Sequence, residues 1–258
     1  MFESAKLKLE RAEQHVRDLD SAHTAFVDQR PHRPVIKGER KDGVWRGWIE
    51  VIVDRQLPPE FALILGDAIH NYRCVLDHLV WELVGVDGGT QDRHTKFPFG
   101  RTRVDFEAMT RGVITPAQST KNFLASLAVY PMGQGEALYA VHALDNADKH
   151  RVITPVLHFS YLGGILLFDM QTGERFHADP VYVGPVGDGS TIAFEIPEGC
   201  GIEADHRFYP TPDIFFPKID VFPNEPVIPA LAWISSAVEA TVTDFERFAT
   251  GRMLNSTP

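Results

Sequence analysis

The sequence predicts an α+β protein: a helical bundle with an N-terminal β-hairpin and a mostly antiparallel β-sheet inserted before its last helix. Three observations predict this class. Long segments repeat apolar residues every three or four positions, as amphipathic helices do. The stretch 152–222 instead alternates short β-prone runs with Gly, Pro and Asp turns. No Pro/Ser-rich linker separates this stretch from the helices, so we expect a single compact unit.

The first half of the chain alternates between helix and hairpin patterns. A stripe of apolar residues predicts a helix over Glu3–Gln29. Pro31 ends it, and two β-prone runs around Lys41-Asp42-Gly43 predict a hairpin at about 35–54. A loop is expected over 96–100, and further helices are expected at about 59–84, 103–110, 117–129 and 136–151.

The second half changes from helical to β-like patterns and then returns to a helix. A stripe that includes Leu231, Val238 and Phe245 predicts a last helix over 229–249. The strands of the inserted sheet are expected at 152–159, 165–170, 175–183, 191–196 and 214–221. The predicted organisation is a bundle with its hairpin over 1–151, an inserted β region over 152–222, and a helix that completes the bundle over 223–258.

Charge and cysteine content narrow the classes of function. The 25 Lys and Arg against 35 Asp and Glu give a net charge of -10, which carries no DNA-binding signal, and RNA would need a local basic patch. The two cysteines, Cys74 and Cys200, form no Cys-x-x-Cys pair, so we expect a reducing, cytoplasmic setting. Neither a signal peptide nor a membrane span is predicted, and no membrane partner is expected.

Polar residues gather in the helix expected at 59–84. Asp67, Asn71, Cys74 and His78 fall on one stripe at about 100° per residue, among apolar neighbours. A polar group that becomes buried needs either a partner or a function. The sequence therefore locates a candidate site on this helix.

The segment Asn71–His78, in which four residues separate Arg73 from His78, resembles the signature of the HEPN superfamily (higher eukaryotes and prokaryotes nucleotide-binding). Many members of this superfamily of helical bundles are metal-independent ribonucleases. The resemblance implies a homodimer of the defence or toxin type that cleaves RNA where two copies of this helix meet. Arg73 would hold the scissile phosphate and His78 would transfer a proton. The candidate catalytic residues are Arg73, His78, Asn71 and Asp77.

Two short segments resemble other proteins of no known activity. They are Leu65–Asn71 and Asp145–Arg151, which are similar to segments of uncharacterised proteins of actinobacteria and their phages. The second segment belongs to the helix expected at 136–151, where polar residues recur with i, i+3, i+4, i+7 spacing. The candidate binding residues of this second helix are His142, Asp145, Asn146, Asp148, Lys149 and His150.

A structural network is the second hypothesis for these residues. If the two polar helices pack antiparallel, their polar stripes meet. We then expect salt bridges from Asp67 or Asp77 to Lys149, and hydrogen bonds from Asn71 or His78. Such a network would set the register of two helices in a non-enzymatic binding or assembly protein.

A metal-dependent hydrolase at the same place is the third hypothesis. His and Asp side chains that converge from two helices offer ligands that zinc, manganese or iron accept. The spacing matches neither His-Glu-x-x-His nor the Glu-x-x-His of di-iron bundles, so no metal or other cofactor is expected. If a metal is bound, its ligands are expected among His70, His78, Asp77, His142 and Asp145.

Overall fold

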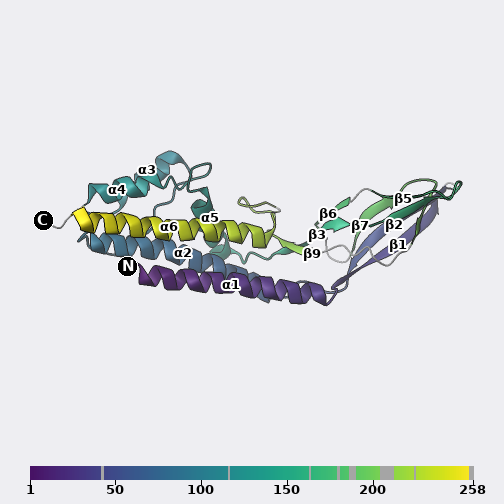
Figure 1. The fold of residues 1–258 in the computed structure, drawn as a ribbon, viewed down its shortest axis with the longest axis horizontal. Coiled ribbons are helices and arrows are strands. Elements are labelled where there is room, and N and C mark those ends of the chain that lie inside the picture. The colour runs from purple at the N-terminus through teal and green to yellow at the C-terminus, as the bar shows by residue number, and fades with distance from the viewer. Residues whose placement is uncertain are drawn as a thin grey trace.

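The protein is elongated, with long helices side by side at one end and the β-strands at the other (Figure 1). This computed structural model describes residues 1–41, 44–115, 117–162, 164–178, 181–185, 190–203, 212–223 and 225–255. In these residues no helix has both the length and the hydropathy needed to cross a membrane.

The predicted α+β class is confirmed, and the bundle consists of the helices that the apolar periodicity predicted. The described residues form the helices α1 (Glu3–Asp28), α2 (Glu60–Val86), α3 (Arg103–Gly112), α4 (Gln118–Ser126), α5 (Glu136–His150) and α6 (Val227–Asn255). Helix α2 packs against α1, α5 and α6, while α3 and α4 pack on each other. Figure 1 shows α3 and α4 lying on one side of the long helices.

Helix α2 is the centre of the core because apolar residues occupy most of its circumference. Ile69, Val75, Leu79 and Val80 are each at most 1% exposed. Full burial of one such side chain contributes about 1.5–3 kcal/mol relative to leaving it in water. This burial fixes the position of α2 relative to its neighbours.

The expected N-terminal hairpin is present, and it belongs to a larger sheet. Its strands are β1 (His32–Lys41) and β2 (Val44–Val53), and the predicted turn at 42–43 lies outside the described residues. Strand β7 (Ser190–Ile196) of the inserted region pairs with β2, so that the sheet order is β1-β2-β7. The hairpin and the inserted region therefore contribute strands to the same sheet.

Two further sheets complete the β end of the molecule. Their orders are β6-β3-β9 and β5-β4-β8, and the described strand pairs are all antiparallel, as expected. The remaining strands are β3 (Val156–Leu162), β4 (Leu166–Asp169), β5 (Arg175–His177), β6 (Val181–Pro185), β8 (Cys200–Glu203) and β9 (Pro212–Phe215).

Several expected boundaries are wrong. The run expected at 175–183 forms two strands that belong to different sheets, and β8 was not predicted at all. Strand β9 ends at Phe215 instead of continuing to residue 221, and Pro217, which has no N–H to donate, follows it. Helix α4 ends at Ser126 instead of residue 129, because Ala128 has the left-handed φ of 47°.

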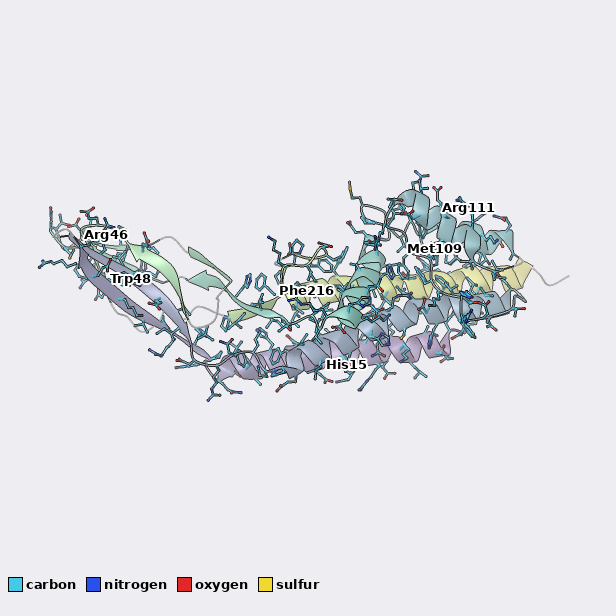
Figure 2. The ribbon with its side chains drawn as sticks, turned by 180° about the vertical axis from the view of Figure 1, so that it is seen from behind. His15, Arg46, Trp48, Met109, Arg111 and Phe216 are labelled. Atoms are coloured by element: carbon cyan, nitrogen blue, oxygen red, sulfur yellow. The ribbon has the colours of Figure 1, made fainter. Side chains whose placement is uncertain are left out.

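The two ends of the molecule present different structures. Arg46 and Trp48 lie on the hairpin at one end, whereas Met109 and Arg111 lie on α3 near the other end (Figure 2). The polar residues singled out in α2 and α5 lie in the helical part of the molecule. A candidate site built on them is therefore held by long, packed helices.

Candidate functional site

The two polar helices pack against each other and run antiparallel. Gly66 lies next to Asp148, and further along α2 His70 lies next to Asp145, which precedes Asp148 on α5. A Cβ added to Gly66 would lie 2.7 Å from Asp148 Oδ2. The glycine therefore permits close approach of α5 where the polar residues meet.

Asp145 is the centre of the polar network. Only 2% of this residue is exposed, and its Oδ1 lies 2.9 Å from Nδ1 of His70 on α2. Its Oδ2 accepts a hydrogen bond from Lys149 Nζ at 2.5 Å. More than half of the His70 and Lys149 side chains is exposed. Burial of a carboxylate is unfavourable unless it is paired, and here both oxygens have partners.

The partners within this network differ from those predicted. Lys149 pairs with Asp145 of its own helix, so the expected bridges to Asp67 or Asp77 are wrong. Asn71 turns away from α5: its Oδ1 accepts a hydrogen bond from Lys8 Nζ of α1 at 3.2 Å. The side chain that links α2 to α5 is His70, which the sequence suggested only as a conditional metal ligand.

Arg73 is buried and engaged by its neighbours. It is 8% exposed, and its Nη1 lies 2.5 Å from Asp77 Oδ1. Its guanidinium carbon lies 4.4 Å from the centre of the Phe99 ring, within the range of a cation–π contact. Asp77 also accepts a hydrogen bond from the main-chain N–H of Phe97 at 2.9 Å. The Arg73–Asp77 pair thus anchors the segment 97–99 to α2.

His78 does not join this group. It lies five positions after Arg73, which is about 140° further around the helix. It shares the stripe of Asn71, whose side chain contacts α1. Its Nδ1 is buried and has no hydrogen-bond partner among the described residues. In a single chain Arg73 and His78 therefore lie on different sides of α2.

His142 occupies the position beside Phe99. The two rings stack with centroids 4.3 Å apart and planes at 10°, and the Asn146 side-chain nitrogen lies 3.1 Å from His142 Nε2. Burial, followed by the positive charge of Arg73, lowers the pKa of His142 to about 4, although Asp145 opposes this shift. The imidazole is therefore neutral near pH 7.

His142 and Asn146 line a cavity of about 770 Å³, here named the α5 cavity. Its wall is largely aromatic and aliphatic, and it also holds the charged residues Arg101 and Asp220. The cavity combines apolar and polar surface, and its size is within the range of small-molecule sites. Sequence reasoning placed Phe99, Tyr139 and Asp220 in an expected loop, helix and strand, but it assigned no binding role to them or to Arg101, because the patterns used do not show which segments meet in space.

A smaller cavity of about 340 Å³ lies beside the network and is lined by Gly66, His70, Asp145 and Lys149, among others. Asp148, which also lines it, accepts the main-chain N–H of Ile153 at 3.1 Å through Oδ1. These contacts hold the C-terminal end of α5 in place. His150, the last residue of α5, is exposed.

The conditional metal ligands are not gathered into one site. Only His70 and Asp145 are in contact, while Asp77 and His142 lie at Phe97 and Phe99. In the part of the chain that the structure describes, no three His, Cys, Asp or Glu side chains form a group that could hold a metal ion. The described geometry thus offers no ready-made metal centre.

Comparison with known proteins adds no identification. No family model matches the chain, and no curated protein or solved structure matches it. A function must therefore be inferred from the contacts described above.

Proposed function

We propose that this protein is a non-enzymatic binding protein in which the polar residues of α2 and α5 form a structural network beside a ligand cavity. The observation that carries the proposal is that these side chains bind one another. Asp145 is bound to His70 and Lys149, and Arg73 is bound to Asp77. Of these contacts, His70 to Asp145 joins α2 to α5, and a buried carboxylate that is satisfied across two helices favours a single packing of them.

The α5 cavity is the binding site in this proposal. Its aromatic and aliphatic wall favours a small, planar, apolar body. Arg101 offers a guanidinium to a carboxylate, and the neutral imidazole of His142 offers one donor and one acceptor. We therefore expect a planar ligand with one anionic group.

Binding to the α5 cavity is tested by calorimetry with indole-3-carboxylate as the probe. We expect the native protein to bind this anion and to bind the neutral indole-3-carboxamide much more weakly. Arg101→Gln is expected to weaken binding of the anion roughly tenfold, since a charge-assisted contact is lost. The control is Arg103→Gln, because Arg103 does not line this cavity. Equal affinity of Arg101→Gln and Arg103→Gln for indole-3-carboxylate would contradict the assignment of the α5 cavity as the binding site.

The ribonuclease hypothesis needs Arg73 and His78 at the same phosphate, and an RNA-cleavage assay in EDTA separates it from the structural one. As a ribonuclease, native protein cleaves RNA, and Arg73→Ala or His78→Ala abolishes cleavage without changing stability. In the structural role, we expect no cleavage by the native protein and a loss of about 1–3 kcal/mol of unfolding free energy in Arg73→Ala. Arg17→Ala, at an exposed position of α1, is the control.

A further inference from the structure

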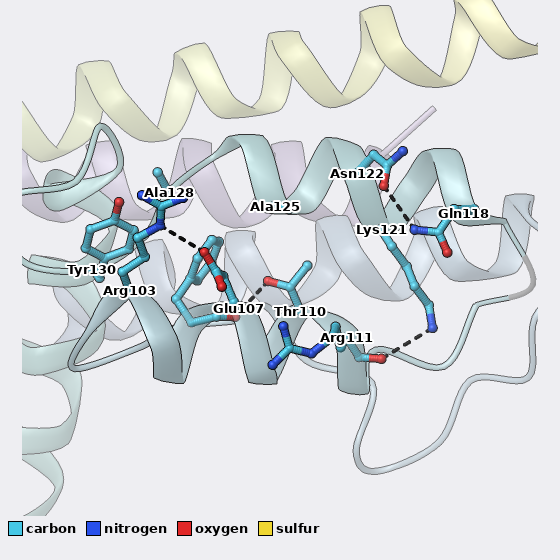
Figure 3. A pocket seen from close by; sticks show the side chains of 11 residues that line it. Arg103, Glu107, Thr110, Arg111, Gln118, Lys121, Asn122, Ala125, Ala128 and Tyr130 are labelled. Atoms are coloured by element: carbon cyan, nitrogen blue, oxygen red, sulfur yellow. Dashed lines mark hydrogen bonds and ion pairs between the residues drawn. The ribbon is translucent and has the colours of Figure 1, made fainter.

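A third cavity, of about 620 Å³, lies between α3 and α4 and is here named the α3–α4 groove (Figure 3). Phe106, which is 1% exposed, lines it together with Ala125 and Ala128. Polar side chains from both helices surround this apolar floor: Arg103, Glu107, Arg111, Gln118, Lys121 and Asn122. The groove shares no lining residue with the α5 cavity.

The groove holds more positive than negative charge. Three of its lining side chains are cations and only Glu107 is an anion. Glu107 is already engaged, because its Oε1 lies 2.9 Å from Nε of Arg103. Among the described residues, neither Arg111 nor Lys121 takes part in an ion pair, so their charges are uncompensated in a chain of net charge -10.

A hydrogen bond joins Lys121 to the main chain of Arg111. Lys121 Nζ donates to the main-chain carbonyl of Arg111 at 3.3 Å. The lysine side chain therefore reaches from α4 to the end of α3, beside the residue that carries the second cation (Figure 3). An ammonium has three donors and this contact uses one, so two remain for an anion.

An aromatic surface lies towards the other end of the groove. Tyr130 stands near Arg103 there (Figure 3), and its ring centroid lies 5.9 Å from that of the buried Phe106. Aromatic faces favour contact with other planar rings. The groove thus combines a cationic end with a surface for a flat, apolar group.

We propose that the α3–α4 groove binds a small phosphate monoester, with Arg111 and Lys121 holding the phosphate and Tyr130 contacting an attached planar group. Guanidinium and ammonium groups are common phosphate-binding side chains in proteins. The volume of the groove is that of a small-molecule site. A nucleic acid fits less well, because the net charge of -10 repels a polyanion.

Calorimetry with adenosine 5′-monophosphate, inorganic phosphate and adenosine tests this site. We expect the monophosphate to bind, phosphate to bind more weakly, and adenosine to show no measurable binding. The double variant Arg111→Gln/Lys121→Gln is expected to raise the Kd for the monophosphate at least roughly tenfold. The control, Arg17→Gln/Arg247→Gln, removes two positive charges from exposed positions outside the groove and is expected to leave the Kd within about twofold.

Three outcomes would overturn the proposal: no binding of the monophosphate by native protein, equal binding by the double variant, or tighter binding of a ten-nucleotide single-stranded RNA that competes at the same site. Circular dichroism checks the fold of each variant. If the double variant is unfolded, Arg111→Glu at this exposed position must abolish binding instead. Binding of indole-3-carboxylate to the double variant is expected to be unchanged, so that failure at the groove is distinguishable from failure at the α5 cavity.

Discussion

Gly66 on α2 lies so close to Asp148 on α5 that a Cβ on the glycine would be 2.7 Å from Asp148 Oδ2. The carboxylate is not free to move away, because its other oxygen accepts the main-chain N–H of Ile153 at 3.1 Å. The lack of a side chain at position 66 thus lets α5 approach α2 beside the network centred on Asp145.

Gly66→Ala is expected to lower the free energy of unfolding by about 1–3 kcal/mol, because the added methyl group forces the two helices or the carboxylate to shift. This loss would occur although alanine favours a helix by about 1 kcal/mol over glycine. The matched control is Gly251→Ala in α6, where a Cβ meets no atom within 4 Å and a gain of up to about 1 kcal/mol is expected. Urea unfolding measures both, and equal stabilities of the two variants would show that the contact imposes no constraint.

Asp145→Asn keeps the shape of the side chain and removes the charge that pairs with His70 and Lys149. We expect a loss of about 1–3 kcal/mol in unfolding free energy, because the buried group no longer satisfies both partners. The control is Asp244→Asn on α6, whose exposed pair with Arg247 is expected to contribute less than about 1 kcal/mol. A loss at Asp145 no larger than at Asp244 would refute the central place of this carboxylate.

Stability is expected to depend on pH through His142. Its pKa is about 4 in the folded protein and 6.5 ordinarily, so between these values the unfolded chain binds more protons. Stability therefore rises with pH from about 4 to about 6.5 and is lost as the pH falls through this window. After allowance for partial exposure of the ring, we expect a loss of about 1–2 kcal/mol between pH 7 and pH 4.

His142→Gln isolates this effect. Burial also lowers the pKa of His15 and His158, so both contribute to the pH dependence of the native protein and of the variant. The difference between the two unfolding curves, measured from pH 4 to pH 7, therefore reports His142 alone. If the unfolding free energy of the variant depends on pH as steeply as that of the native protein, the imidazole of His142 is not kept neutral by its surroundings.

The bundle helices could be predicted because helical periodicity is a local property of the sequence. The bounds expected for α1, α2 and α5 lie within two residues of those observed, whereas α6 was expected to end at residue 249 and continues to Asn255. Strand pairing is not local. Nothing in 190–196 indicates that β7 pairs with the distant hairpin strand β2, and nothing in 175–183 indicates that this run divides between two sheets.

The packing of two polar helices could be proposed from sequence, but their contacts could not be predicted. Antiparallel packing of these helices was one hypothesis, and α2 and α5 do pack against each other. Which residue faces which depends on the rotation of each helix and on the loops that pack against it. The Phe99 ring, supplied by a loop, lies against both Arg73 and His142, and the spacing of residues along α2 or α5 carries no sign of it.

Ala128 follows α4 with φ of 47°, a conformation that favours glycine over residues with a Cβ. Its carbonyl accepts main-chain hydrogen bonds from Tyr130 and Gly135, so this turn is held in place. Ala128→Gly is expected to raise the unfolding free energy by up to about 1 kcal/mol, because the steric cost of the left-handed conformation disappears. The matched control is Ala125→Gly within α4, where the same substitution is expected to cost about 1 kcal/mol of helix stability. Urea unfolding measures both changes. A higher unfolding free energy in Ala128→Gly with a lower one in Ala125→Gly would establish the strain at Ala128, whereas destabilisation by both substitutions would disprove it.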